Sequence, residues 1–258
     1  MPQPVELFFW ATPNCWKITI ALEEMALPYA VRPVAIGRGE QFEPAFLAIS
    51  PNNRVPAIVD RDGPGGEPVT IFESGAILQY LGRKTGRFYP REGRARLEVE
   101  QWLLWQVGGV GPMFGQASHF RNYAPALVAA PARIEYGAKR YSNETNRLLG
   151  VLDKRLAGRD FVAGDYSIAD MALYPWIGYV GHLGQDIGDF PHVAAWLERV
   201  GARPAVQRGM NVGSDLRAPP PEAGTREQRE FAQALFGQTA ESVAAAAHRA
   251  AQSARAES

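Results

Sequence analysis

Along the first ninety residues, short runs of strand-forming residues alternate with segments in which apolar residues recur at helical spacing. The run VELFFWA favours a strand, and apolar side chains then recur at helical spacing over residues 16–27. YAVRPVAI favours a second strand and EPAFLAIS a short helix, while VPAIVD and EPVTIF flank a Gly/Pro-rich turn as a hairpin does. ESGAILQYLGRKTG predicts a last helix. Because a strand–helix–strand unit joins parallel strands, residues 1–90 are expected to form an α/β domain with a mixed sheet.

From about residue 94 the pattern becomes helical throughout. Long helical periods such as RARLEVEQWLLWQV and FPHVAAWLERVGAR replace the strand signals, so residues 94–217 predict an all-α domain. The stretch FYPREGR suits a linker between the two domains. The glycines and proline of GGVGPMF are expected to break a helix.

The last residues, 218–258, form a Pro/Ala-rich extension. APPPEAG cannot continue a helix, whereas the alanine-rich remainder favours one. Two interpretations stay open: an appended helix that packs through Phe231, Leu235 and Phe236, or a frayed tail. We expect order near Phe231 and disorder at the end.

Composition excludes several classes of function. Lysine plus arginine and aspartate plus glutamate number 27 each, which gives no field favouring nucleic acid or an anionic membrane. No apolar run approaches the roughly 18 residues of a spanning helix, and the N-terminus lacks the features of a signal peptide. One cysteine permits no intrachain disulfide, so a cytoplasmic location is expected. The four histidines are scattered, and no metal site is expected.

Three short stretches carry residues suited to a peptide-like ligand. A cis Val55–Pro56 bond would turn the Val55 N–H and C=O outward to pair with an extended ligand; the alternative is an ordinary trans proline at a strand start. Glu73 and Ser74 begin a helix, where free N–H groups and the dipole favour a carboxylate; alternatively Ser74 only caps its own helix.

The third stretch is TPNC, between the first strand and its helix. Thr12 and Asn14 carry short hydrogen-bond donors that would stabilise a thiolate at the helix N-terminus and lower its pKa. The alternative is that Asn14 serves only as the N-cap.

The blocks TPNCWKITIALEE, GEQFEPAFLAISPNNRVPAIVD, IFESGAILQYL and LLWQVGGVGPMFGQ closely resemble the Nu class of glutathione transferases, the Ure2-like bacterial disulfide-bond oxidoreductases. The resemblance runs from about Val5 to Arg208. It implies a thioredoxin-like N-terminal domain followed by an all-helical domain. It also implies a homodimer that binds two reduced glutathione molecules (GSH) or one oxidised dimer (GSSG) per site.

The resemblance also implies roles for individual residues. Thr12 and Asn14 would approach the glutathione sulfurs, and the Val55 backbone would pair with the cysteinyl unit. At the two ends of the tripeptide, the remaining residues are Gln41 and Arg54 for the glycyl end, Glu73 and Ser74 for the γ-glutamyl group, and Arg140 reaching over from the helical domain.

Cys15 departs from the family pattern, which usually has glycine at this position. An exposed cysteine at a helix N-terminus would have a depressed pKa and could attack a mixed disulfide. Alternatively its thiol points into the interface between helix and sheet. Because glutathione supplies the thiolate, we expect Cys15 to be a bystander.

The main hypothesis is a glutathione-dependent reductase of small disulfides that needs no metal. One alternative is conjugation, in which the same thiolate attacks an electrophile in a cleft lined by Phe114 and Tyr123, with His119 nearby. The other alternative is a non-catalytic glutathione sensor that uses its extension to bind a partner.

Overall fold

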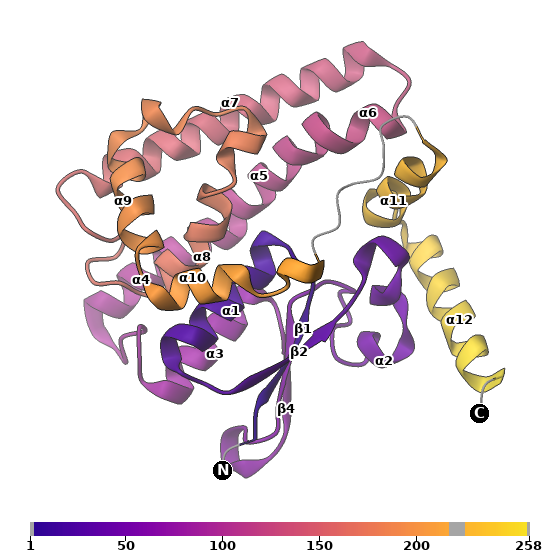
Figure 1. Ribbon diagram of the computed structural model, residues 1–258, viewed down its shortest axis with the longest axis horizontal. Coiled ribbons are helices and arrows are strands. Elements are labelled where there is room, and N and C mark those ends of the chain that lie inside the picture. Colours follow the sequence, from indigo (N-terminus) through magenta and orange to yellow (C-terminus); the bar gives the residue numbers. More distant parts are fainter. Residues whose placement is uncertain (1–2, 217–224, 257–258) are drawn as a thin grey trace. The chain divides into compact units, whose positions relative to one another are not determined.

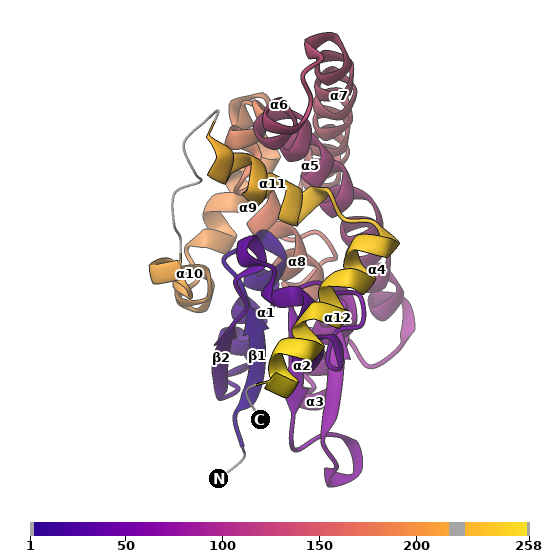
Figure 2. The same cartoon turned by 90° about the vertical axis from the view of Figure 1, so that its right-hand side faces the viewer.

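The computed structural model describes residues 3–216 and 225–256 (Figures 1 and 2). They form two compact units. Unit 1 holds the described residues of the ranges 1–11, 28–73 and 213–258, and unit 2 holds residues 12–27 and 74–212. These units interleave along the chain, and the linear boundaries expected near residues 90 and 217 stay a prediction.

Unit 1 is built on a four-stranded mixed sheet in the order β2-β1-β3-β4. The strands are β1 (Val5–Phe9), β2 (Tyr29–Pro33), β3 (Ala57–Asp60) and β4 (Val69–Phe72). β1 runs parallel to β2 and antiparallel to β3, so Leu7 lies opposite both Val31 and Ile58. The parallel pair and the antiparallel hairpin β3–β4 are those that the sequence predicts.

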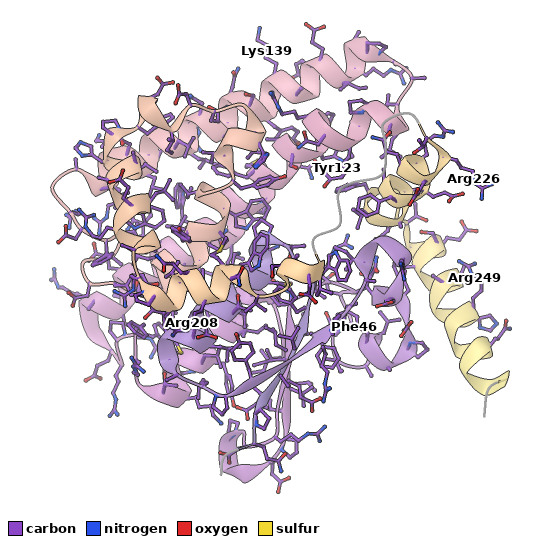
Figure 3. The ribbon with its side chains drawn as sticks, in the orientation of Figure 1. Phe46, Tyr123, Lys139, Arg208, Arg226 and Arg249 are labelled. Carbon is purple, nitrogen blue, oxygen red and sulfur yellow. The ribbon has the colours of Figure 1, made fainter. Side chains whose placement is uncertain are left out.

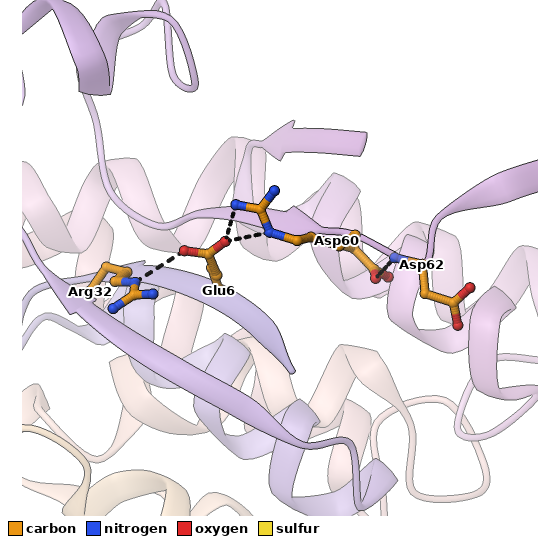
Figure 4. A network of polar contacts seen from close by, with 5 residues as sticks. Glu6, Arg32, Asp60 and Asp62 are labelled. Carbon is orange, nitrogen blue, oxygen red and sulfur yellow. Dashed lines mark hydrogen bonds and ion pairs between the residues drawn. The ribbon is translucent and has the colours of Figure 1, made fainter. Parts of the chain in front are cut away.

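One face of β1 is buried, and its other face carries charged side chains. Side chains alternate along β1 between buried and partly exposed positions, as a half-buried strand requires. On the partly exposed face, Glu6 accepts hydrogen bonds from Arg32 (3.1 Å to Nε) and from Arg61 (3.0 Å to Nε and 2.8 Å to Nη2). This network, drawn in Figure 4, ties three neighbouring chain segments together and lowers the pKa of Glu6, chiefly through the Arg61 bond.

Short helices complete unit 1 beside the sheet. They are η1 (Ile36–Arg38), η2 (Glu40–Phe42), α2 (Pro44–Leu47), η3 (Pro64–Gly66) and η8 (Ser214–Leu216). Phe46 of α2, labelled in Figure 3, is 5% exposed and packs at 5.9 Å between ring centroids against Phe8. Val55 packs against the same small cluster, which fixes the chain just before β3.

The C-terminal extension belongs to unit 1 and contains α11 (Arg226–Phe236) and α12 (Ala240–Ala256). Phe231 packs against η1 so closely that a methyl group at Gly37 would lie 2.4 Å from the ring. Arg226 and Arg249, labelled in Figure 3, are exposed. The predicted break at residues 218–224 and the last two residues lie outside the described residues.

Unit 2 is helical. Its elements are α1 (Pro13–Met25), α3 (Ser74–Thr85), α4 (Gly93–Trp105), η4 (Gln106–Val110), α5 (Gly111–Ser118), η5 (His119–Tyr123), α6 (Ala124–Leu127), α7 (Pro131–Leu156), α8 (Ile168–Ile177), η6 (Val180–Leu183), η7 (Ile187–Asp189), α9 (Pro191–Gly201) and α10 (Pro204–Asn211). α1 packs against α3, α8 and α10, and this explains why it is buried on most of its circumference.

The expected break at GGVGPMF is wrong. The helix widens instead into the π-helical turn η4 and continues as α5, with Pro112 in the first turn of α5. A π turn shifts the hydrogen-bond register without ending the helix, and such turns are common at functional sites. Here the turn places Gln106 in the interior, with no exposed surface.

The start of α8 is a buried capping box. Asp170 accepts from the Ser167 N–H (3.0 Å), the Val162 N–H (3.0 Å) and Trp196 Nε1 (2.9 Å), while Ser167 Oγ accepts from the Ala169 N–H. Burial raises the pKa of Asp170, and the hydrogen bonds oppose that change. The motif YSIAD therefore has a structural role.

Candidate functional site

The start of α1 presents two polar side chains from unit 2. Thr12 is the N-cap, with extended backbone and Oγ1 accepting from the Cys15 N–H at 3.4 Å, and Pro13 follows in the first turn. Asn14 therefore lies inside the first turn, so the alternative that it caps the helix is wrong. Its side chain is left for another task.

That side chain is oriented by a tryptophan from α8. Trp176 Nε1 lies 3.0 Å from Asn14 Oδ1. Because an indole N–H can only donate, the oxygen must face Trp176 and the NH₂ group must point elsewhere. Among the described residues no acceptor lies within hydrogen-bond distance of Nδ2, and Asn14 is partly exposed. The arrangement supplies two free N–H donors beside a helix N-terminus, where a thiolate would be stabilised.

Cys15, the next residue, is buried. Its side chain has no exposed surface. A thiol that attacks a disulfide must be reachable by it, so this burial argues against a catalytic role and supports the bystander interpretation.

The start of α3 carries Glu73 and Ser74. Glu73 has a left-handed backbone (φ 69°), which is uncommon for a residue with a side chain and concentrates at functional sites. Its carboxylate is exposed and lies 3.4 Å from Asn52 Nδ2. Ser74 is 8% exposed, and its Oγ accepts at 3.2 Å from the buried ammonium of Lys17. Lys17 thus joins the starts of α1 and α3 inside unit 2.

In unit 1 the Val55–Pro56 bond is cis, as the first of the two sequence interpretations required. The Val55 N–H and C=O have no hydrogen-bond partner among the described residues. Val55 is partly exposed and lies two residues before β3 begins at Ala57. An extended ligand can therefore pair with this backbone as an added strand would.

Two further polar residues of unit 1 are Gln41 and Arg54. Gln41 is 1% exposed, yet neither Nε2 nor Oε1 of its amide has a partner among the described residues. Arg54 is exposed, and partial desolvation lowers its pKa. Its Nη1 donates to Gln238 Oε1 of the extension at 3.0 Å, and Asn53 Nδ2 donates to the same oxygen at 3.1 Å.

Arg140 lies on α7, where it is exposed. Its Nη1 is 3.7 Å from Glu144 Oε2 one turn further along, and its guanidinium is 6.0 Å from the Tyr141 ring. These contacts are local to the helix, so the role that the resemblance implies for Arg140 stays a prediction.

The side chains expected to line an electrophile cleft do not fit that role equally. Phe114 has no exposed surface, so it cannot contact an electrophile from solvent. Tyr123 is half-buried, and desolvation, followed by its neighbour Tyr179, raises its pKa. Burial also lowers the pKa of His119. Phe114 therefore cannot line the electrophile cleft that the conjugation hypothesis requires.

Within the part of the chain that the structure describes, no cluster of histidine, cysteine and acidic side chains is arranged to hold a metal ion. Over the same residues, no helix combines the length and the apolar character needed to cross a bilayer.

Sequence reasoning missed three residues that organise these polar groups: Lys17, Trp176 and Gln238. Lys17 offered a signal, because it is a charged residue directly before the apolar run of α1 that begins at Ile18. Trp176 and Gln238 offered none, since each acts on a residue more than 160 positions away.

Comparison with known proteins identifies the family. The family described as glutathione S-transferase, N-terminal domain, matches residues 11–84, and that described as glutathione S-transferase, C-terminal domain, matches residues 123–204. The extension lies beyond both matches. The chain is similar to the disulfide-bond oxidoreductase YfcG of Escherichia coli, with 48% identity over 80% of this chain and 94% of YfcG.

Solved structures similar to this chain are also glutathione transferases. A glutathione transferase family member from Pseudomonas fluorescens, crystallised with two glutathione bound, shares 44% identity and a TM-score of 0.75, covering 81% of this chain and 93% of its own. A glutathione transferase from Pseudomonas putida, with one glutathione disulfide per subunit, shares 40% identity and a TM-score of 0.75, covering 81% and 91%. The chain therefore belongs to the glutathione S-transferase family.

Proposed function

We propose that the protein is a glutathione-dependent disulfide-bond oxidoreductase that binds two GSH or one GSSG per site and reduces small disulfides. The names and bound ligands of YfcG and the two Pseudomonas proteins support this proposal. The observation that carries it is the Asn14 amide, held by Trp176 with its donors free, beside a cysteine that has no exposed surface. The chain thus offers a place for a foreign thiolate and no accessible thiol of its own.

The reaction is two successive thiol–disulfide exchanges. The sulfur of one GSH attacks a disulfide as its thiolate, forming a mixed disulfide and releasing one substrate thiolate, which takes up a proton. The second GSH attacks the mixed disulfide, so GSSG forms and the other substrate thiolate leaves. Asn14 and Thr12 stabilise the attacking thiolate, because donated hydrogen bonds favour the charged form and lower the thiol pKa.

The remaining residues bind the tripeptide. Ser74 and Glu73 take the carboxylate and the ammonium of the γ-glutamyl group, and the Val55 backbone pairs with the cysteinyl unit. Gln41 and Arg54 take the glycyl end. The unpaired buried amide of Gln41 supports this assignment, because native structures rarely leave such a group without a partner.

Arg140 reaches the bound tripeptide from α7. Its contact with Glu144 is 3.7 Å long and leaves 54% of the Arg140 side chain exposed, so the guanidinium is open to a ligand carboxylate. Arg140→Ala is expected to weaken GSH binding, whereas an unchanged Kd by calorimetry would remove Arg140 from the site.

The protein acts as a cytoplasmic homodimer in this proposal. Leu97 and Leu104 of α4 are 59% and 62% exposed and lie seven residues apart, on one face of the helix. A second copy of the chain would cover them. Sedimentation should give a dimer for the wild type and a monomer for the variant Leu97→Asp/Leu104→Asp. A monomeric wild type would contradict the dimer.

The test of the function compares two substrates. With GSH as donor, the protein should reduce 2-hydroxyethyl disulfide rapidly and conjugate a chlorinated aromatic slowly. Faster conjugation would favour the transferase alternative. Binding of glutathione without turnover of either substrate would favour the sensor.

A further inference from the structure

A buried lysine lies behind the proposed carboxylate subsite. Lys17 is 2% exposed, and its Nζ donates to Ser74 Oγ (3.2 Å) and to Gln106 Oε1 (2.6 Å). Burying an ammonium is costly unless it is hydrogen-bonded, so a lysine here must be held by several acceptors. The π-helical turn η4 supplies one of them by directing Gln106 inward.

The bond to Ser74 has a consequence for the serine proton. An ammonium has three donors and no acceptor, so Ser74 Oγ must accept from Lys17. The Ser74 hydroxyl hydrogen therefore points to another acceptor, and among the described residues no other side-chain partner of Ser74 is found. Ser74 keeps 8% of its surface exposed at the start of α3, and its O–H is the donor that remains for a ligand.

We propose that Lys17 is a positioning residue that makes the start of α3 selective for a carboxylate. It acts through Ser74, whose hydroxyl it fixes as a donor to the ligand carboxylate. This inference rests on the proposed function, because it assigns the γ-glutamyl carboxylate of glutathione as the group selected.

The test compares two ligands on the full-length protein by calorimetry. One is GSH, and the other is 4-aminobutanoyl-Cys-Gly, which keeps the ammonium but lacks the γ-glutamyl carboxylate. Lys17→Met should weaken GSH binding roughly 10- to 100-fold, as expected for loss of hydrogen bonding to a charged group. Binding of the analogue should change by less than about twofold, the scatter expected for an independent site.

Matched variants separate this role from a structural one. Lys154→Met, at an exposed position of α7, should change neither affinity. Lys17→Gln, which keeps a neutral donor, serves where Lys17→Met fails to fold, and should show the same preference for weakening GSH. In a Ser74→Ala background, the effect of Lys17→Met on GSH should disappear, because the lysine acts through the serine.

An equal loss for both ligands, or a full loss in the Ser74→Ala background, would overturn the inference. A wild-type protein that binds no GSH would instead refute the proposed function. The two failures are therefore distinguishable.

A separate observation concerns the glycyl end of the ligand. Gln238, between α11 and α12, places one carboxamide oxygen within 3.0 Å of Arg54 Nη1 and 3.1 Å of Asn53 Nδ2. A guanidinium and an amide N–H that both donate to one oxygen form a site suited to binding a carboxylate. No acidic partner of Arg54 is found within residues 3–216 and 225–256.

The turn that carries Gln41 is adjacent to the same extension. α12 packs against η2 and α2, and Gln41 of η2 is buried with its amide unpaired. Both residues proposed for the glycyl end thus lie where the extension contacts the rest of unit 1.

The geometry points to Gln238 as a specificity-determining residue whose carboxamide stands in for the glycyl carboxylate. A ligand with that carboxylate must displace Gln238, whereas a ligand that ends before the glycine need not. Gln238 therefore reduces the preference for GSH over γ-glutamylcysteine. This inference too rests on the proposed function.

Two substitutions of opposite effect test it. Gln238→Ala should tighten GSH roughly 3- to 10-fold by removing the competing hydrogen bonds. Gln238→Glu should weaken GSH by a similar factor, because a carboxylate binds Arg54 more strongly than a carboxamide. Affinity for γ-glutamylcysteine should stay within about twofold in both, and Gln252→Ala, at an exposed position of α12, is the control.

Weaker GSH binding by Gln238→Ala would mean that the extension helps to hold the ligand, and would overturn the inference. Equal tightening of both ligands would overturn it as well. If wild-type protein binds neither ligand, the proposed function fails instead.

Discussion

The polar side chains at the starts of α1 and α3 differ from those around Gln41 and Arg54. In unit 2, Asn14 and Ser74 each accept one hydrogen bond from a deeper residue, Trp176 or Lys17, and keep their donors free. In unit 1, the Gln41 amide has no partner among the described residues, and Arg54 is engaged by the extension.

The difference teaches two ways of preparing for a ligand. The groups of unit 2 are oriented in advance, so binding a thiolate or a carboxylate requires little rearrangement. Gln41 instead leaves buried polar atoms unsatisfied, at a cost of about 1–3 kcal/mol each, until a ligand arrives. The unpaired amide of Gln41 thus lowers the stability of the unliganded protein, whereas the oriented side chains of unit 2 reduce the rearrangement that binding requires.

The largest expected effect separates two adjacent residues. Asn14→Ala should lower the turnover of 2-hydroxyethyl disulfide about 100-fold, because it removes the donors from the thiolate. Cys15→Ser should lower it at most about threefold, in keeping with a bystander thiol. Equal or reversed losses in the GSH-coupled assay would show that the sulfur-binding group has been misassigned.

A smaller effect tests whether Asn14 is oriented in advance. Trp176→Phe keeps an aromatic ring but removes the indole donor, so the amide can turn its oxygen outward. Turnover should fall roughly fivefold, the worth of about one hydrogen bond. In an Asn14→Ala background the same change should alter turnover by less than about twofold, and a full fivefold loss there would show that Trp176 acts independently.

A substitution at Gln41 is expected to increase stability. Gln41→Met replaces an unpaired amide with an apolar side chain of similar size, which should raise the free energy of unfolding in urea by about 1 kcal/mol. GSH affinity by calorimetry should fall in the same variant. A destabilised variant would mean that the wild-type amide is satisfied after all.

Whether a feature can be predicted from the sequence depends on how far apart along the chain the residues that form it lie. The mixed sheet and the capping box of Ser167 and Asp170 follow from local patterns. The cis Val55–Pro56 bond is one of two interpretations that the local pattern leaves open. The lysine behind Ser74 and the tryptophan behind Asn14 do not, because tertiary packing alone brings them together.

At two other places the structure differs from the prediction because the local sequence allows two conformations and the pattern does not decide between them. Glycine and proline predict a break at GGVGPMF, but a π turn accommodates both and keeps the helix continuous. An asparagine after a threonine and a proline suits an N-cap, yet Thr12 takes that place because Pro13 fits the first turn.

The smallest effect concerns the charged network on the sheet, which lies apart from the proposed ligand contacts. Arg61 and then Arg32 lower the pKa of Glu6, so the stability it contributes is present above the unfolded pKa of about 4.3 and is lost as the pH falls through the lowered folded value. Glu6→Gln should remove at most about 1 kcal/mol above that range, and nothing at lower pH. Urea unfolding at several pH values measures this, and a loss independent of pH would contradict it.

The most direct measurement is the titration of protein-bound GSH by the ultraviolet absorbance of its thiolate. The wild type should show a thiol pKa well below the ordinary cysteine value of about 8.5, and Asn14→Ala should bring it back towards that value. Bound GSH that titrates in the wild type as it does in free solution would contradict the account.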